Sequence, residues 1–137
     1  MQRDALEKLI HGCPFHRFLD LELVDYESES GSVTIALPLR EEFSRSDDSV
    51  ELHGGITATL IDIAGDYAVA VKTGFGVPTI NLRVDYLKMG RGTKITAHAR
   101  AVRIGRSIGT VDIEVEDATG ALVAVGRGTY STVPPRS

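Results

Sequence analysis

Apolar and polar residues alternate along most of the second half of the chain. The segment 108–116 shows this most clearly, because Val111, Ile113 and Val115 alternate with acidic residues. A period of two residues places one face of a strand in a core and the other in solvent. Similar runs, bounded by turn-forming residues, predict six strands. These strands cover 19–26, 31–39, 77–87, 93–102, 108–116 and 122–132.

Two segments follow a helical period instead. In 3–11 the apolar residues recur at helical spacing, and Gly12 and Pro14 end the pattern. The segment 53–74 is the only long helical candidate, and the polar stretch 41–52 predicts a loop with at most a short strand. One helix cannot cover both faces of a mostly antiparallel sheet, so the sheet is expected to curve around the long helix.

The predicted fold is therefore a single α+β domain over 1–137, with an N-terminal helix within 1–12 and a frayed tail at 133–137.

The long central helix carries mostly small or apolar residues on the side opposite its core-facing stripe. A face exposed to solvent would usually carry Lys, Glu and Arg instead. Glycine inside a helix costs about 1 kcal/mol relative to alanine. Gly65 within this face therefore predicts that another group packs closely against the helix there. This face consists of Gly54, Gly55, Ala58, Thr59, Asp62, Gly65, Asp66 and Val69.

The start of this helix predicts a site for a developing negative charge. Gly54 and Gly55 follow His53, and the first N–H groups of a helix have no partner within it. Together with the helix dipole, such N–H groups form an oxyanion hole. The His-Gly-Gly sequence alone is weakly specific, since many helices begin with glycine.

Asp62 is the candidate reactive carboxylate, and its position implies a second copy of the chain. It lies eight residues after Gly54, which is about 12 Å along a helix. A reacting carbonyl carbon has to be about 3 Å from both its oxyanion donor and its attacking group. Two antiparallel helices in a two-fold dimer would place Asp62 of one copy beside Gly54 of the other, with the small face as the contact.

Composition and charge argue against several other classes. The formal net charge of −4 disfavours a general nucleic-acid binder. No apolar run reaches the roughly 20 residues of a membrane span, and no signal peptide is visible, so a cytoplasmic location is expected. Cys13, as the single cysteine, cannot form an intrachain disulfide, and the scattered histidines predict no metal site. The sequence predicts no Gly-x-Ser-x-Gly elbow between a strand and a helix, which argues against a serine hydrolase.

The segment HGGITATLIDIAGDYA resembles the helix motif of the hotdog-fold thioesterases, in particular the phenylacetic-acid-degradation (PaaI-like) acyl-CoA thioesterases. The resemblance extends to PTINLRVDYL, AVRIGRSIGTVDIEVED and LVAVGRGTY, and so covers nearly the whole chain after the first helix. It implies a hotdog fold, hydrolysis of acyl-CoA thioesters, and homodimers that commonly pair into homotetramers. Coenzyme A is part of the substrate, and no separate cofactor is implied.

The resemblance also implies roles for individual residues. Gly54 supplies the oxyanion-hole N–H, Asp62 acts as nucleophile or general base, and His53 shapes the site at the head of the helix. Thr79, two residues before Asn81, matches a hydroxyl that assists catalysis in some members, and Asn81 is assigned to substrate binding.

A second group of residues is implied in substrate binding. Gly105, Arg106 and Ser107 lie where some members bind coenzyme A, and Gly55 lies beside the oxyanion donor. The basic residues of the later strands are either an ordinary solvated surface or contacts to the coenzyme A phosphates. They are Arg83, Lys88, Arg91, Lys94, Arg100, Arg103 and Arg106.

Two residues depart from the family pattern. Asp47 stands six residues before the histidine, where many members carry Asn or Gln that helps hold the thioester or water. Asp66 stands where a small residue is usual, one turn after Asp62, and is interpreted as a polar contact or as a second carboxylate that interacts with Asp62.

The sequence leaves several alternatives open. Asp62 acts either on a water molecule or directly on the carbonyl. The acyl group is a small aromatic or a medium-chain one, and its carrier is coenzyme A or a carrier protein. A non-catalytic acyl-CoA-binding hotdog module is the alternative function, kept open by Asp47. A hotdog dehydratase or hydratase ranks last.

Overall fold

The computed structural model describes residues 1–47 and 49–137. Its helices are α1 (Arg3–Gly12), α2 (Pro14–Leu19) and α3 (Gly54–Thr73), with a 3-10 turn at Glu41–Phe43. In this part of the chain six strands form one antiparallel sheet. Across the sheet they are ordered β1 (Glu22–Glu27), β2 (Ser32–Pro38), β6 (Lys94–Ile104), β7 (Ile108–Asp117), β8 (Leu122–Ser131) and β5 (Thr79–Tyr86). Two short strands, β3 (Ser44–Ser46) and β4 (Ser49–Leu52), form a separate hairpin.

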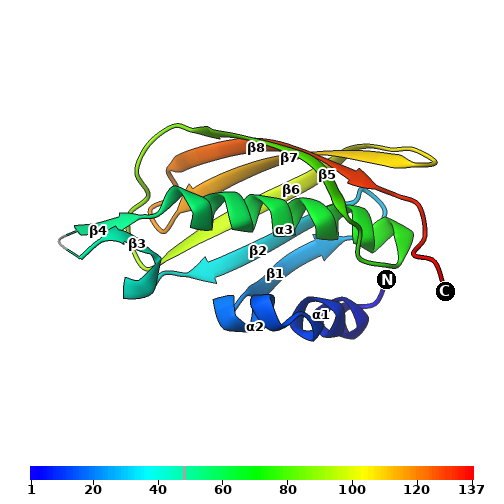
Figure 1. Ribbon diagram of the computed structural model, residues 1–137, viewed down its shortest axis with the longest axis horizontal. Coiled ribbons are helices and arrows are strands. Elements are labelled where there is room, and N and C mark those ends of the chain that lie inside the picture. Colours follow the sequence, from blue (N-terminus) through cyan, green and yellow to red (C-terminus); the bar gives the residue numbers. More distant parts are fainter. Residues whose placement is uncertain (48) are drawn as a thin grey trace.

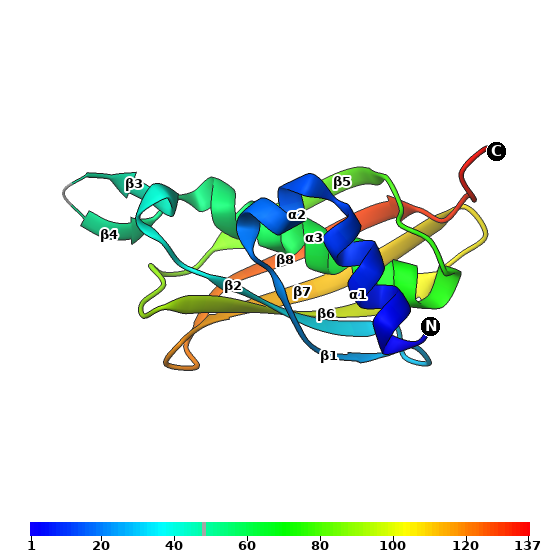
Figure 2. The same ribbon diagram turned by 90° about the horizontal axis from the view of Figure 1, so that it is seen from below.

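The large sheet curves around α3, which lies along its concave side (Figure 1). The alternation in the sequence explains this, because Val111, Ile113 and Val115 of β7 are buried under the helix while Asp112 and Glu114 are exposed on the other face. The view turned by 90° shows α1 and α2 on the same side of the sheet as α3, next to β1 (Figure 2). The expected curved antiparallel sheet around one long helix is therefore present.

The apolar character of α3 reflects this packing. By length and composition alone, Gly54–Thr73 would also be long and apolar enough to cross a membrane. In this fold, however, Leu60, Ile61, Ala64 and Val69 are fully buried in the core that α3 forms with the large sheet. A helix enclosed by a sheet is expected to be apolar over most of its circumference.

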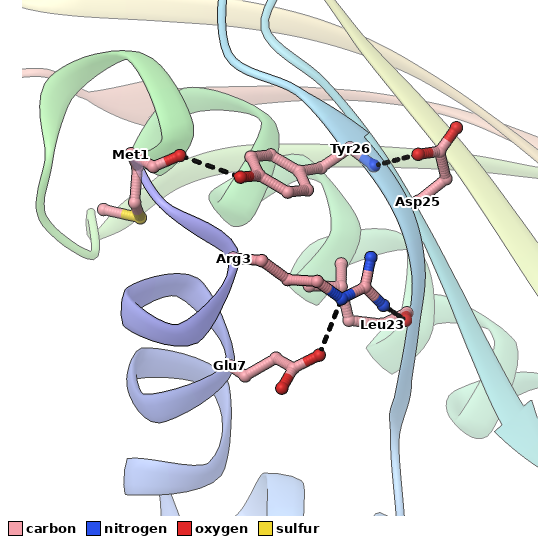
Figure 3. A network of polar contacts seen from close by, with 6 residues as sticks. All are labelled: Met1, Arg3, Glu7, Leu23, Asp25 and Tyr26. Atoms are coloured by element: carbon pink, nitrogen blue, oxygen red, sulfur yellow. Dashed lines mark hydrogen bonds and ion pairs between the residues drawn. The ribbon is translucent and has the colours of Figure 1, made fainter.

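The N-terminal helix is fastened to the edge of the sheet by polar contacts with β1 (Figure 3). Arg3 pairs with Glu7 one turn later, and its Nη2 donates to the Leu23 carbonyl at 2.6 Å. The Tyr26 hydroxyl donates to the Met1 carbonyl at 2.9 Å. These contacts hold α1 over β1, so that the apolar face carrying its leucine and isoleucine residues closes one side of the core.

The start of the chain differs from its prediction after the first helix. That helix ends at Gly12, before Pro14, as predicted, but a second helix that was not predicted follows it. Pro14 is the first residue of α2, where its fixed φ and missing N–H are tolerated. Leu19 consequently ends α2 instead of beginning a strand. The stretch 41–52, predicted as a loop with at most a short strand, contains the 3-10 turn and the two short strands of the β3–β4 hairpin.

The close neighbour predicted for Gly65 exists, and it belongs to the same chain. A Cβ at Gly65 would overlap the ring of Tyr130 in β8, and a Cβ at Gly128 would overlap the same ring. Tyr130 is fully buried between these two glycines. Gly65 therefore makes room for an aromatic side chain of its own sheet, and the expectation that it faces a partner helix was wrong. Ala58, Thr59 and Asp62, earlier on this face, are only partly buried.

Candidate active site

The head of α3 leaves one backbone N–H available for a ligand. His53 is the N-cap, and its Nδ1 accepts a hydrogen bond from the Gly55 N–H at 2.9 Å. The His53 carbonyl accepts from the Ile56 N–H at 3.0 Å. Within the part of the chain that the structure describes, the Gly54 N–H has no such partner. The expectation of two free glycine N–H groups was therefore wrong for Gly55, and Gly54 is left as the candidate oxyanion donor.

Tyr86 at the end of β5 covers this position, and sequence reasoning missed it. Its hydroxyl donates to the Gly54 carbonyl at 2.6 Å. A Cβ at Gly54 would lie 3.3 Å from the Tyr86 ring, so glycine lets the phenol lie close to the backbone. Nothing local to Tyr86 in the sequence marks this role, because the contact spans 32 residues. The head of α3 is thus fastened from one side by His53 and from the other by Tyr86.

Asp62 lies in the middle of α3, partly buried, and is paired with a hydroxyl. Its Oδ1 accepts a hydrogen bond from Thr79 Oγ1 at 2.6 Å. A hydrogen bond of this length to a carboxylate is strong and holds the group in one orientation. With Oδ1 occupied by Thr79, Oδ2 is the oxygen left for a reacting group. The structure therefore brings together the carboxylate and the hydroxyl to which the resemblance gave separate roles.

An irregularity in β5 separates Thr79 from Asn81. Thr79 is opposite Tyr130 of β8 and Asn81 is opposite Thr129, so two residues of β8 face three of β5. Such a bulge changes which face of the sheet a side chain points to. Thr79 reaches Asp62 under the sheet, while Asn81 lies in a surface hollow beside Arg83 and Thr129. Asn81 is therefore not part of the Asp62 site within this chain.

A second carboxylate, Asp66, lies one turn beyond Asp62. Its Oδ1 accepts a hydrogen bond from the Val77 N–H at 2.9 Å. Burial raises the pKa of Asp66 to about 7, the bond from Val77 opposes this shift, and the negative charge of Asp62 adds to it. Tyr130 completes the surroundings, since its hydroxyl donates to the Asp62 main-chain carbonyl at 3.1 Å. Burial raises the pKa of this phenol as well.

The remaining candidates lie toward the two ends of α3. Asp47 is exposed on the turn of the β3–β4 hairpin, which projects beyond the N-terminal end of α3 (Figure 1). Gly105, Arg106 and Ser107 form the turn between β6 and β7, near the other end of the helix, and Thr132 Oγ1 donates to the Gly105 carbonyl at 2.8 Å. One chain thus does not gather all predicted site residues, and Gly54 stays about 12 Å from Asp62 along α3.

Comparison with known sequences identifies relatives over most of the chain. The family model described as the thioesterase superfamily matches residues 51–124, more than half of the chain. A Halobacterium salinarum protein with a provisional esterase name is 36% identical over 82% of this chain and 80% of its own length. The medium/long-chain acyl-CoA thioesterase YigI of Escherichia coli is 27% identical over 90% of this chain and 88% of its own length.

Solved structures agree with this assignment. A thioesterase-superfamily protein solved by X-ray methods superposes with a TM-score of 0.88, at 36% identity over 93% of this chain and 96% of its own. The E. coli PaaI protein of the phenylacetic acid degradation operon superposes with a TM-score of 0.82 over 96% and 95% of the two chains, and at 20% identity it supports the fold. The fold and family predicted from the sequence are confirmed: the chain belongs to the thioesterase superfamily, with a hotdog fold, and is a thioester hydrolase.

Proposed function

We propose that this thioester hydrolase acts on acyl-coenzyme A with a small aromatic or medium-chain acyl group. The observation that carries the proposal is the Asp62–Thr79 pair, a partly exposed carboxylate held by a hydroxyl in the middle of the core helix. The name of the E. coli relative YigI, a medium/long-chain acyl-CoA thioesterase, supports the aliphatic class. The aromatic class rests on the resemblance to the PaaI-like thioesterases.

The simplest mechanism uses Asp62 as a general base. Asp62 Oδ2 takes a proton from a water molecule as the water oxygen attacks the thioester carbonyl carbon. The carbonyl oxygen becomes an oxyanion that accepts a hydrogen bond from a Gly54 N–H. The C–S bond then breaks, and the proton held by Asp62 passes to the leaving thiolate, which gives free acid and coenzyme A. Thr79 keeps the carboxylate oriented throughout.

Direct attack by Asp62 is the alternative mechanism. Asp62 Oδ2 would displace the thiolate and form an acyl–carboxyl anhydride, which water then hydrolyses. A single turnover in H₂¹⁸O distinguishes the two. Direct attack, with water adding at the Asp62 carbonyl of the anhydride, leaves label in the protein, whereas general-base catalysis sends all label to the product acid. Mass spectrometry of the peptide that contains Asp62 measures the outcome.

We further propose a homodimer that shares its active sites, and pairing of dimers into a tetramer. The sheet ends at β5, whose outer edge has no neighbouring strand within the described part of the chain. Ile80, Tyr86 and Leu87, on and next to this strand, are each more than half exposed. An open apolar edge pairs readily with a second strand. Two-fold pairing of β5 with its copy would set the two α3 helices antiparallel, and Gly54 of one copy near Asp62 of the other.

The first experiment measures release of free thiol from a panel of acyl-CoAs by the wild-type protein and Asp62→Asn at neutral pH. We expect turnover by the wild type and loss of at least a hundredfold in kcat for the folded variant. Turnover by Asp62→Asn at the wild-type rate would exclude Asp62 as the reactive group. Acyl-CoA binding without turnover by either protein would favour the binding-module function instead.

Complementation tests the shared site separately. Asp62→Ala and Gly54→Pro each inactivate both sites of a homodimer, but a mixed dimer retains one site with neither substitution. Mixing the two folded variants under conditions of subunit exchange is expected to restore activity, up to about a quarter of the wild-type level because half of the dimers are mixed and each has one intact site. Native mass spectrometry verifies that exchange has occurred. Complete exchange without any activity would rule out the cross-subunit arrangement.

A further inference from the structure

The mechanism above leaves Asp66 without a role. This carboxylate sits on the same face of α3 as Asp62, one turn further on, and is half-buried. Placing a second negative charge there disfavours ionisation of the pair. A small apolar side chain would fit the helix without that penalty, so the contact made by Asp66 calls for an explanation.

Asp66 and Asp62 bind neighbouring points of one short segment. Asp66 Oδ1 accepts the Val77 N–H at 2.9 Å, and Asp62 Oδ1 accepts the Thr79 hydroxyl at 2.6 Å. Between them, the Pro78 carbonyl accepts a hydrogen bond from the Ser131 N–H at 2.9 Å. The segment 77–79 is thus held by two adjacent turns of α3 on one side and by the end of β8 on the other.

This segment is stiff, so fixing one end of it fixes the other. The ring of Pro78 sets its own φ, and its Cδ restricts the backbone of Val77 to extended conformations. The Val77 side chain is buried, at 7% exposed. Directly after Thr79, however, the register between β5 and β8 shifts by one residue at the bulge. Regular pairing with β8 therefore does not continue past Thr79 without interruption. The position of the Thr79 hydroxyl therefore depends on the anchor at Val77.

From this geometry we propose that Asp66 is a positioning residue for the hydrolysis, an inference that rests on the proposed function. By binding the Val77 N–H it fixes the start of β5, and the rigid Val77–Pro78–Thr79 segment then holds the Thr79 hydroxyl on Asp62. Asp66 touches neither substrate nor reacting atoms; it acts through Thr79. Residues before the bulge of β5 are thereby aligned with α3 by two carboxylates instead of one.

The electrostatic surroundings of Asp66 make this anchor sensitive to pH. Asp62 and Tyr67 from α3 and Tyr130 from β8 interact with it electrostatically, and burial raises the pKa of both phenols. Both phenols thus stay neutral in the range where Asp66 titrates. Above its own pKa of about 7, Asp66 is a carboxylate that accepts the Val77 N–H in a charge-assisted bond. Below that pH it is a neutral acid and a weaker acceptor.

A double-mutant cycle on the dimeric enzyme tests the inference. Asp66→Ala removes the anchor, Thr79→Val removes the hydroxyl, and each is expected to lower kcat about tenfold with little change in KM, about the value of one hydrogen bond. Because Asp66 acts through Thr79, the double variant should lose about tenfold as well, not a hundredfold. Losses that multiply, or an Asp66→Ala variant with wild-type kcat, would overturn the proposal.

Asp66→Asn supplies a readout that a merely structural role would not move. Its amide oxygen still accepts the Val77 N–H but carries no charge at any pH. The ratio of wild-type to Asp66→Asn activity is expected to be near one below pH 6 and to rise severalfold above pH 8. A ratio that does not change with pH would contradict the charge-assisted anchor. Amide hydrogen exchange at Val77, expected to speed up in Asp66→Ala, reports on the anchor without any activity. If the wild type is inactive but its Val77 amide exchanges slowly, the proposed function is wrong and the anchoring of Val77 by Asp66 still stands.

Discussion

The packing of Tyr130 between two glycines gives a sharp test of how the core supports the site. Replacement of Gly65 by alanine would place a methyl group where the Tyr130 phenol now lies. Tyr130 is fully buried and cannot swing into solvent, so the ring or the helix has to shift. The Tyr130 hydroxyl would then lose its bond to the Asp62 main-chain carbonyl.

The magnitude follows from three terms. Overpacking a core costs about 1–3 kcal/mol, and the lost hydrogen bond costs about 1 kcal/mol. Exchanging glycine for alanine inside a helix returns about 1 kcal/mol. Gly65→Ala is therefore expected to lower the free energy of unfolding by about 1–3 kcal/mol and to lower kcat, because the backbone that carries Asp62 shifts with Tyr130.

Denaturant unfolding at one fixed protein concentration measures this change, since the stability of the proposed dimer would depend on concentration. Gly12→Ala is the matched control, because a Cβ at Gly12 in α1 meets nothing within 4 Å and should leave stability unchanged or slightly raised. Tyr130→Phe removes the oxygen that is nearest to the new methyl group, so Gly65→Ala should cost less in that background. If Gly65→Ala is as stable as the wild type, or if Tyr130→Phe gives no relief, the packing argument is refuted.

Three further predictions follow from the site. Thr79→Val should reduce kcat about tenfold and leave KM and far-ultraviolet circular dichroism unchanged; an unaltered kcat would show that Asp62 needs no hydroxyl. Tyr86→Phe loses the 2.6 Å bond to the Gly54 carbonyl and should lower kcat/KM severalfold, while the free energy of unfolding changes by less than about 1 kcal/mol. Lower stability with an unchanged kcat/KM would contradict a role at the oxyanion donor. Asp66 has a pKa raised from 3.8 to about 7, so the folded state binds the extra proton and stability falls as pH rises between these values. The free energy of unfolding of Asp66→Asn should therefore exceed that of the wild type by about 1–3 kcal/mol at pH 8, with no such gain at pH 4. Equal differences at both pH values would contradict the raised pKa.

The sequence by itself determined the elements whose cause is local. The alternation of 108–116 and the long apolar period of 53–74 follow from spacings of two to four residues, so β7 and α3 were predicted nearly to their ends. The 12 Å between Gly54 and Asp62 is likewise a property of any helix with that spacing. Even locally, one signal was ambiguous: proline ends a helix but also begins one, and only the structure shows that Pro14 begins α2.

Tertiary structure decided everything that depends on the register of the sheet. The sequence could not show that a bulge turns Thr79 toward Asp62 and leaves Asn81 on the outer surface, because a shift of one residue exchanges the two faces of a strand. Nor could it show that the close neighbour of Gly65 is Tyr130, 65 positions later in the chain, or that Asp66 binds the Val77 N–H. These contacts join segments far apart in the sequence, and their geometry is fixed only when the strands have paired around α3.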